Sequence, residues 1–165
     1  MANYKGHIVG ALVCSFLYSS ILLFVPVVYF AELAGVLDGN WAIAAVFVIG
    51  MMFGLLPDID TNSKGQDVFF GIALVFDLLL LWQGYIQAAA YLGLIAMLPV
   101  VGKHRGWTHS KITMFVLPLP ILVFPYLYNE KTLPVALVYY GAAVVGYFSH
   151  LLLDGLIIKR FRIKT

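Results

Sequence analysis

Histidines and aspartates that could bind a metal stand at four separate places in this 165-residue chain. Imidazole nitrogens and carboxylate oxygens together form a ligand set that zinc and related divalent metals prefer. A metal that keeps one open position can also activate water for hydrolysis, because it lowers the pKa of that water towards ~7. The candidate ligands are His7, Asp58, Asp60, His104, His109, His150 and Asp154.

His150 is the strongest single candidate because it stands inside a long apolar segment. Ionisable residues in such segments are costly and are usually functional. Asp154 follows four residues later, so on a helix the two side chains share one face. A hydrogen-bonded His–Asp pair without a metal is the alternative. His7, at the mouth of the first apolar segment, and His104, in a basic loop, could each also be ordinary interfacial residues.

The elements that must position these groups are apolar helices in a membrane. Hydrophobic residues make up 62% of the chain and charged residues 11%, whereas an average soluble domain has roughly 25% charged residues. The net charge of +2 does not suggest nucleic-acid binding, and the single cysteine, Cys14, excludes a disulfide framework. We therefore expect one all-α domain over residues 1–165, a polytopic membrane helical bundle.

Long apolar runs predict about six transmembrane helices in this bundle. The first run is too long for the apolar region of a signal peptide, so we expect it to be retained. Only residues 83–84 separate the third and fourth runs, which indicates a tight helical hairpin. Pro118, Pro120 and Pro125 predict a kink in the fifth run, and Ser110 is a suitable N-cap for it. The runs cover residues 8–31, 41–57, 68–82, 85–101, 112–128 and 134–158.

The cationic residues predict the orientation of the chain in the membrane. With six spans and an inside N-terminus, nine Lys and Arg residues lie on the cytoplasmic side and Lys131 alone lies outside. An excess of Lys and Arg is typical of cytoplasmic loops. Both termini and all the candidate ligands are then expected on the cytoplasmic side of the inner (plasma) membrane. The nine residues are Lys5, Lys64, Lys103, Arg105, Lys111, Lys159, Arg160, Arg162 and Lys164.

Four short sequence blocks contain the candidate ligands. They are Gly-His at 6–7, Leu-Leu-Pro-Asp-Ile-Asp at 55–60, His-Arg-Gly-Trp-Thr-His-Ser at 104–110, and Gly-Tyr-Phe-Ser-His at 146–150 followed by Asp154. In this order they resemble the YdjM-like family of inner-membrane metal-dependent hydrolases, which is also labelled LexA-binding. The resemblance implies a membrane-embedded hydrolase with a divalent metal, zinc before others, and a distant likeness to zinc-dependent phospholipase C.

The resemblance also implies roles for the matching residues. One or more divalent metal ions would be bound. Because the candidate ligands lie at headgroup depth, near the membrane lipids, we expect a lipid or another phosphoester as the substrate. Asp58 and His109 would take part in catalysis as well as in metal binding. The implied metal ligands are His7, Asp58, Asp60, His104, His109, His150 and Asp154.

From these residues we expect hydrolysis by a metal-activated water at the cytoplasmic interface. Asp58 and Asp60 are close enough in sequence to bind one metal jointly or to bridge two. A turn between His104 and His109 could direct both rings inward. Arg105 is the catalytic-site candidate for binding a phosphate or carboxylate of the substrate, and the alternative is an interfacial arginine that snorkels towards the headgroups.

Two other classes of function stay open at this point. A transporter or channel would distribute ionisable residues along a path between the two faces of the membrane. Asp77, Gln83 and Gln87 could continue such a path, and we assign Asp77 no catalytic role. The second class is a non-enzymatic membrane module that binds a metal structurally or recruits a cytoplasmic partner, as the label LexA-binding suggests.

Overall fold

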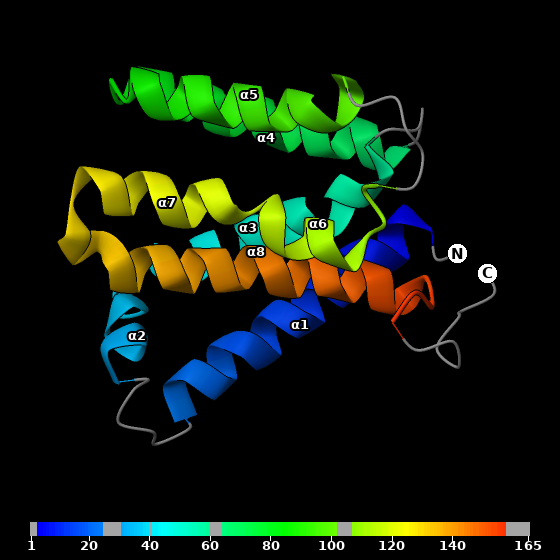
Figure 1. Cartoon of the computed structure of the whole chain (residues 1–165), viewed down its shortest axis with the longest axis horizontal. Helices are drawn as coiled ribbons and strands as arrows, with labels where there is room; N and C mark the ends of the chain where they lie inside the picture. The colour runs from blue at the N-terminus through cyan, green and yellow to red at the C-terminus, as the bar shows by residue number, and fades with distance from the viewer. Residues whose placement is uncertain (1–2, 25–30, 40, 60–63, 102–106, 158–165) are drawn as a thin grey trace.

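The computed structural model describes residues 3–24, 31–39, 41–59, 64–101 and 107–157. Within these residues the secondary structure is helical and no strand occurs, which confirms the all-α prediction. The elements are α1 (Tyr4–Phe24), α2 (Ala31–Val36), α3 (Ala42–Leu55), the 3-10 turn η2 (Leu56–Asp58), α4 (Lys64–Trp82), α5 (Ile86–Val101), α6 (Lys111–Val116), α7 (Leu119–Tyr128), the 3-10 turn η3 (Glu130–Thr132) and α8 (Leu133–Leu153) (Figure 1).

Each predicted apolar run contains a helix, and four helical segments are long and apolar enough to cross a membrane. They are α1, α4, α6 together with α7, and η3 together with α8. The segment from α3 through η2 is apolar but shorter. The count of six spans and the positions of the termini stay predictions. The short helix α2 lies outside the predicted runs except for its first residue.

The predicted breaks between helices are confirmed. Helix α4 ends at Trp82 and the chain reverses through Gly84, whose φ of 81° is left-handed. The fifth run is divided at Leu117–Pro118 into α6 and α7. Ser110 caps α6, because its side chain accepts a hydrogen bond from the backbone N–H of Ile112 at 3.2 Å.

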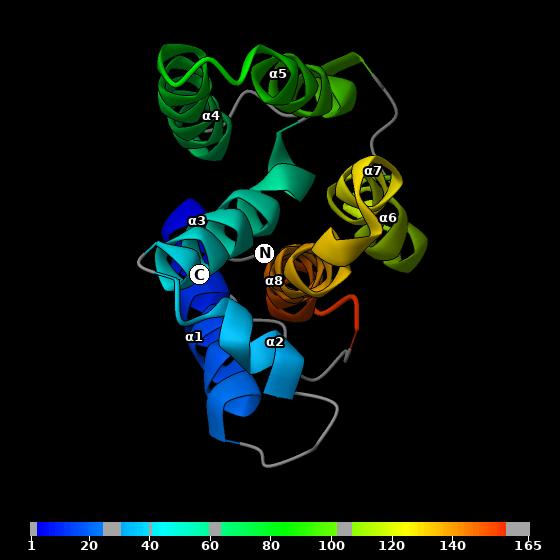
Figure 2. The same ribbon diagram turned by 90° about the vertical axis from the view of Figure 1, so that its left-hand side faces the viewer.

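Helices α1, α3 and α8 pack against one another and form the centre of the molecule. Helix α7 and the short α6 lie along α8, and α2 lies against α8 near the opposite end of the bundle from α6 (Figure 1). The α4–α5 hairpin packs on α3 and η2 at the edge of the bundle (Figure 2). A core that includes Leu55, Leu56, Phe69, Tyr147 and Leu151 joins these layers next to η2.

The close approach of α3 to α8 depends on small residues. Gly146 of α8 lies directly on the backbone of Gly50 in α3, so a Cβ atom on Gly146 would overlap the Gly50 carbonyl and lie 2.8 Å from its Cα. Small residues allow helix backbones to approach in this way within membranes. The contact also brings the C-terminal ends of α3 and α8 together.

We expect Gly146→Ala to destabilise the protein by about 3 kcal/mol, because α8 must move away from α3 to accommodate the methyl group. Thermal unfolding of the detergent-solubilised protein measures this effect. Gly71→Ala is the matched control, since a Cβ at Gly71 meets no atom within 4 Å, and its unfolding midpoint should be unchanged or slightly raised. Equal midpoints for the two variants would contradict the packing argument.

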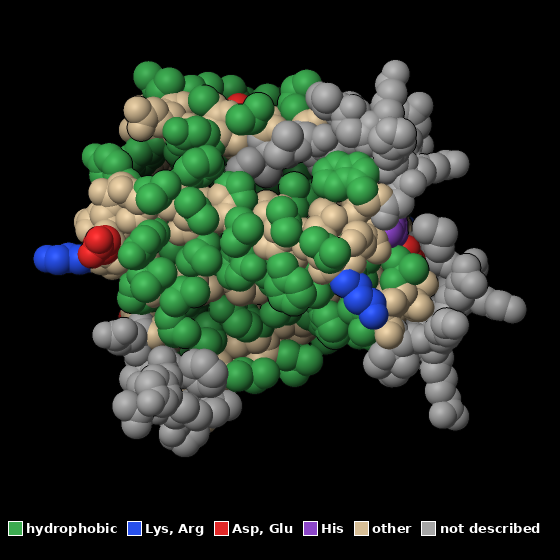
Figure 3. All heavy atoms as spheres, viewed as in Figure 1, with side chains coloured by type: hydrophobic (Ala, Val, Ile, Leu, Met, Phe, Trp, Pro, Cys, Tyr) green, Lys and Arg blue, Asp and Glu red, His purple; other side chains and the backbone are tan. Residues whose placement is uncertain are grey.

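The surface of the bundle suits a membrane. Hydrophobic side chains cover the middle of the face in Figure 3, and its Lys and Arg side chains lie towards the two ends. Many of the largest apolar residues are exposed, among them Phe16, Leu78 and Leu127. One acidic side chain interrupts the apolar surface over the α4–α5 hairpin (Figure 3).

Candidate metal centre

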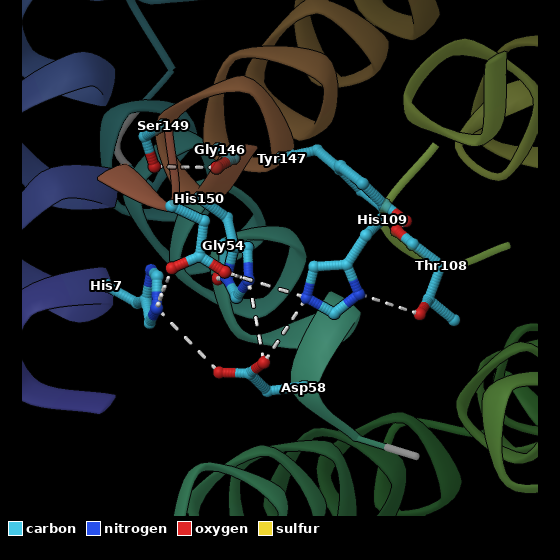
Figure 4. Close-up of polar contacts among 10 residues, drawn as sticks. His7, Gly54, Asp58, Thr108, His109, Gly146, Tyr147, Ser149 and His150 are labelled. Atoms are coloured by element: carbon cyan, nitrogen blue, oxygen red, sulfur yellow. Dashed lines mark hydrogen bonds and ion pairs between the residues drawn. The ribbon is translucent and has the colours of Figure 1, made fainter. Parts of the chain in front are cut away.

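Five of the predicted site residues converge at one end of the bundle. His7 lies in the first turns of α1, Asp58 ends η2, and His109 stands in the turn before α6. His150 lies in the last turn of α8, and Asp154 is the C-cap of that helix. Figure 4 shows the three imidazole rings turned towards one another, with the Asp58 carboxylate beside them.

The three Nε2 atoms face both carboxylates. His150 Nε2 lies 3.6 Å from Asp58 Oδ1 and 3.5 Å from Asp154 Oδ2. His109 Nε2 lies 3.6 and 3.7 Å from the same two oxygens. His7 Nε2 lies 3.8 Å from Asp58 Oδ2 and 3.7 Å from Asp154 Oδ1. Two overlapping groups of donor atoms, each spanning less than 4.8 Å, therefore share His150.

These separations suit metal ligands better than hydrogen bonds. Hydrogen bonds between ring N–H groups and carboxylates are about 2.7–3.2 Å long. Two ligands that bind one zinc ion at about 2.1 Å, at the tetrahedral angle, are about 3.4 Å apart. The observed N–O distances of 3.5 to 3.8 Å are close to that value. The donor set therefore fits a divalent cation at the centre of the cluster.

The orientation of the His150 ring is fixed by its second nitrogen. His150 Nδ1 lies 2.8 Å from the carbonyl oxygen of Gly54 in α3. A carbonyl only accepts, so Nδ1 donates a proton to it and Nε2 is the ring nitrogen that faces the cluster. That Nε2 atom is buried and has no hydrogen-bond partner among the described residues. A histidine held by a carbonyl in this way is the usual arrangement of a metal-ligating imidazole.

His109 is oriented by residues around its own turn and by α8. Its Nδ1 lies within hydrogen-bond distance of the Thr108 hydroxyl, at 3.2 Å. Thr108 is buried, and its carbonyl accepts a hydrogen bond from the Tyr147 hydroxyl of α8. The Thr113 hydroxyl donates to the carbonyl of Trp107 at 2.6 Å. The turn that carries His109 is therefore attached to α6 and to α8.

His7 and Asp154 complete the buried side of the cluster. The rings of His7 and His150 are stacked, with centroids 3.8 Å apart and planes at 12°. Asp154 follows the last turn of α8, and the chain then leaves the helix through Gly155, whose φ is 72°. This left-handed residue ends the helix at the point where the Asp154 carboxylate reaches His150.

The cluster is closed on one side and open on the other. The side chains of His7, His150 and Asp154 are 1%, 0% and 2% exposed. Those of Asp58 and His109 are 23% and 21% exposed. Asp58 and His109 therefore form what we call the open edge, the side of the cluster that is exposed to solvent.

Asp58 lies past the end of α3, and its surroundings make its carboxyl group more acidic. Burial raises the pKa of its carboxyl, but its pairing with His109 and the positive charge available on His150 and His7 lower it. The net effect places the pKa below its ordinary value. The ionised carboxylate, which is the form that binds a metal, is therefore favoured at neutral pH.

The structure describes five of the eight predicted site residues. Asp60, His104 and Arg105 lie outside the described residues. Asp77 is in α4, where it lines a cavity of about 190 Å³ beside Gly93 of α5. Its Oδ1 is buried without a hydrogen-bond partner among the described residues. Asp77 is thus separate from the cluster.

Two contributors to the site were not predicted from the sequence. One is the Gly54 carbonyl, which carries no side-chain signal at all. The other is Tyr147, three residues before His150, whose hydroxyl fixes the Thr108 segment. A polar aromatic residue one helical turn before a ligand is too common a pattern to identify such a contact. Both contacts join residues that are far apart in sequence.

Comparison with protein-family models gives a match over nearly the whole chain. The family model described as YdjM inner membrane protein matches residues 1–159, nearly the whole chain. Neither a curated protein nor a solved structure matches the chain. The match includes all five residues of the cluster and confirms the resemblance that the four sequence blocks suggested.

Proposed function

The chain belongs to the YdjM inner membrane protein family, and we propose that it is a membrane-embedded, metal-dependent hydrolase. One observation supports the proposal above all others. Three imidazole Nε2 atoms lie within 3.8 Å of two carboxylates in two overlapping groups of donors that share His150, and the Gly54 carbonyl orients the His150 ring so that its Nε2 atom faces both carboxylates. A nitrogen and oxygen donor set of this kind suits zinc or a related divalent metal.

The closed and open sides of the cluster have different tasks in this proposal. The buried triad of His7, His150 and Asp154 would hold the ion. When bound, a divalent metal polarises a phosphoryl oxygen and makes water a better nucleophile at neutral pH. Asp58 and His109 stand at the open edge and would face the substrate.

Asp58 is the residue best placed to act as a base. Its ionised carboxylate is partly exposed and would accept a proton from the attacking water. The water oxygen forms a bond to phosphorus, the ester P–O bond breaks, and the leaving oxygen takes up a proton from solvent. His109 borders the same opening and would keep the substrate phosphate within reach of the ion.

We also propose that the protein spans the membrane several times and that the cluster faces the cytoplasm. Lys5, Lys64 and Lys111 lie near the end of the bundle that holds the cluster, close to the candidate ligands in the chain. Loops rich in Lys and Arg stay on the cytoplasmic side. The cluster would then lie at headgroup depth, where a lipid phosphoester is the nearest substrate.

A structural metal site is the second candidate function. The burial of His7, His150 and Asp154 favours it, because structural zinc sites are closed. The open edge at Asp58 and His109 favours catalysis instead. A transporter is less well supported, since the cluster lies at one end of the bundle and Asp77 stands apart from it.

We expect the protein, purified without chelators, to contain a divalent metal in stoichiometric amount and to hydrolyse a phosphoester. Elemental analysis measures the metal, and release of phosphate products from phospholipid vesicles and from a soluble nitrophenyl phosphodiester measures turnover. Removing the metal with a chelator should abolish turnover, and adding zinc back should restore it. Protein without metal would exclude the hydrolase mechanism, and metal without turnover would favour the structural site.

A further inference from the structure

Two apolar grooves lie near the metal centre, on different sides of it. The larger, of about 500 Å³, runs between α1 and α8 and is lined by Gly6, Gly10 and Leu153 among others. His7 and Asp154 border the cluster beside these residues, and their side chains are almost completely buried. This larger groove therefore faces the closed side of the cluster.

The second groove begins next to the open edge. It has a volume of about 290 Å³ and follows α6 to the start of α7. Trp107 lies at its beginning, two residues before His109, and the break between α6 and α7 lies at its far end. Its walls are Trp107, Ile112, Thr113, Val116, Leu117 and Pro120. We call it the α6 groove.

The α6 groove has an apolar wall, and a lysine lies at the end of α6 where the groove begins. Lys111, at the first position of α6, is exposed there and does not itself line the groove. Ile112 and Val116 are 73% and 54% exposed, and both belong to a segment that is long and apolar enough to span a membrane. From Lys111 to Pro120 the helical chain extends about 14 Å along its axis, at 1.5 Å per residue. Lysine near the surface attracts anionic headgroups, and tryptophan favours the interface.

We propose that the α6 groove binds one acyl chain of an anionic lipid whose phosphoester reaches the open edge formed by Asp58 and His109. This inference rests on the proposed function for the reaction, but the binding itself does not require turnover. Lys111 attracts the anionic headgroup, Trp107 lies at the membrane interface beside it, and the apolar wall of the groove contacts the acyl chain. The groove would thereby select lipids over soluble phosphoesters.

Photo-crosslinking tests the binding directly. The metal-loaded protein is reconstituted into phosphatidylcholine vesicles that contain phosphatidylglycerol with a diazirine on one acyl chain, and adducts are mapped by mass spectrometry. Adducts on Trp107, Ile112 and Val116 should exceed those on equally exposed apolar residues elsewhere. An even distribution of adducts over the apolar surface would overturn the proposal, because it is the result for ordinary surrounding lipid.

A variant that fills the groove provides the matched comparison. Val116→Trp places an indole in the groove, and Val75→Trp makes the same change in α4 at a residue of equal exposure, 55% against 54%. Crosslinking to the α6 groove should fall about tenfold in Val116→Trp, the factor expected for losing the burial of roughly two methylene groups. It should be unchanged in Val75→Trp. Equal crosslinking in the two variants would overturn the assignment.

Headgroup recognition is tested with Lys111→Gln and, as its control, Lys131→Gln. Lys111→Gln should reduce crosslinking by the phosphatidylglycerol probe, and Lys131→Gln should not. A diacylglycerol probe with the same acyl chain should crosslink equally to the two variants.

Turnover separates the lipid-binding proposal from the proposed hydrolase function. Groove crosslinking without hydrolysis would end the proposed function and leave the lipid site, whereas hydrolysis with unchanged kcat/KM for lipids in Val116→Trp would end the groove proposal alone.

Discussion

Replacing His150 with alanine is expected to remove the bound metal and, with it, the hydrolytic activity. His150 belongs to both groups of donor atoms, so its loss leaves each group with two residues. Mutating only the partner of a metal-ligating histidine typically weakens metal binding about 10–100-fold. Loss of the ligand itself should exceed that range. Elemental analysis and zinc titration by calorimetry measure the effect.

A second variant separates metal loss from misfolding. Asparagine at position 150 can still donate a hydrogen bond to the Gly54 carbonyl but has no atom that replaces Nε2. His150→Asn should therefore fold and still lose the metal. Ser149→Ala is the neighbouring control, because Ser149 is equally buried and its hydroxyl bonds only the Gly146 carbonyl among the described residues. Full metal content in folded His150→Asn would rule out the centre as described.

Replacing Asp58 with asparagine is expected to separate catalysis from metal binding. The buried triad of His7, His150 and Asp154 is unchanged in this variant, so most of the metal should remain. The charge at the open edge is lost, and with it the base that we propose for the attacking water. We expect kcat/KM to fall by about 10²–10⁴-fold, the contribution of a positioned acid or base. Vesicle hydrolysis and elemental analysis on the same sample measure both effects.

Asp67→Asn is the matched control for this substitution. Asp67 is an exposed aspartate in the first turn of α4, the helix that follows Asp58 in the chain. Its replacement should leave both metal content and kcat/KM close to those of the unchanged protein. If Asp58→Asn kept full activity with bound metal, the base would have to be another group. If it lost the metal completely, Asp58 would be a principal ligand rather than a base.

Local features of this protein could be read from the sequence because their causes are local. The proportion of apolar residues in each run predicted helices, and all the described elements are helical. The Gln83–Gly84 pair predicted the hairpin, and the prolines after Leu117 predicted the break between α6 and α7. His150 and Asp154 are adjacent through the periodicity of one helix, which spacing alone determines.

Only the tertiary structure decided how the separate stretches meet. The contact of Gly50 with Gly146 brings α3 against α8, and this contact places the Gly54 carbonyl next to His150. The Tyr147 hydroxyl likewise positions the turn that carries His109. These contacts involve backbone groups and residues far apart in the chain, so residue types in the sequence do not predict them. The division into a closed side and an open edge follows from the same packing, because burial depends on which helices surround a side chain.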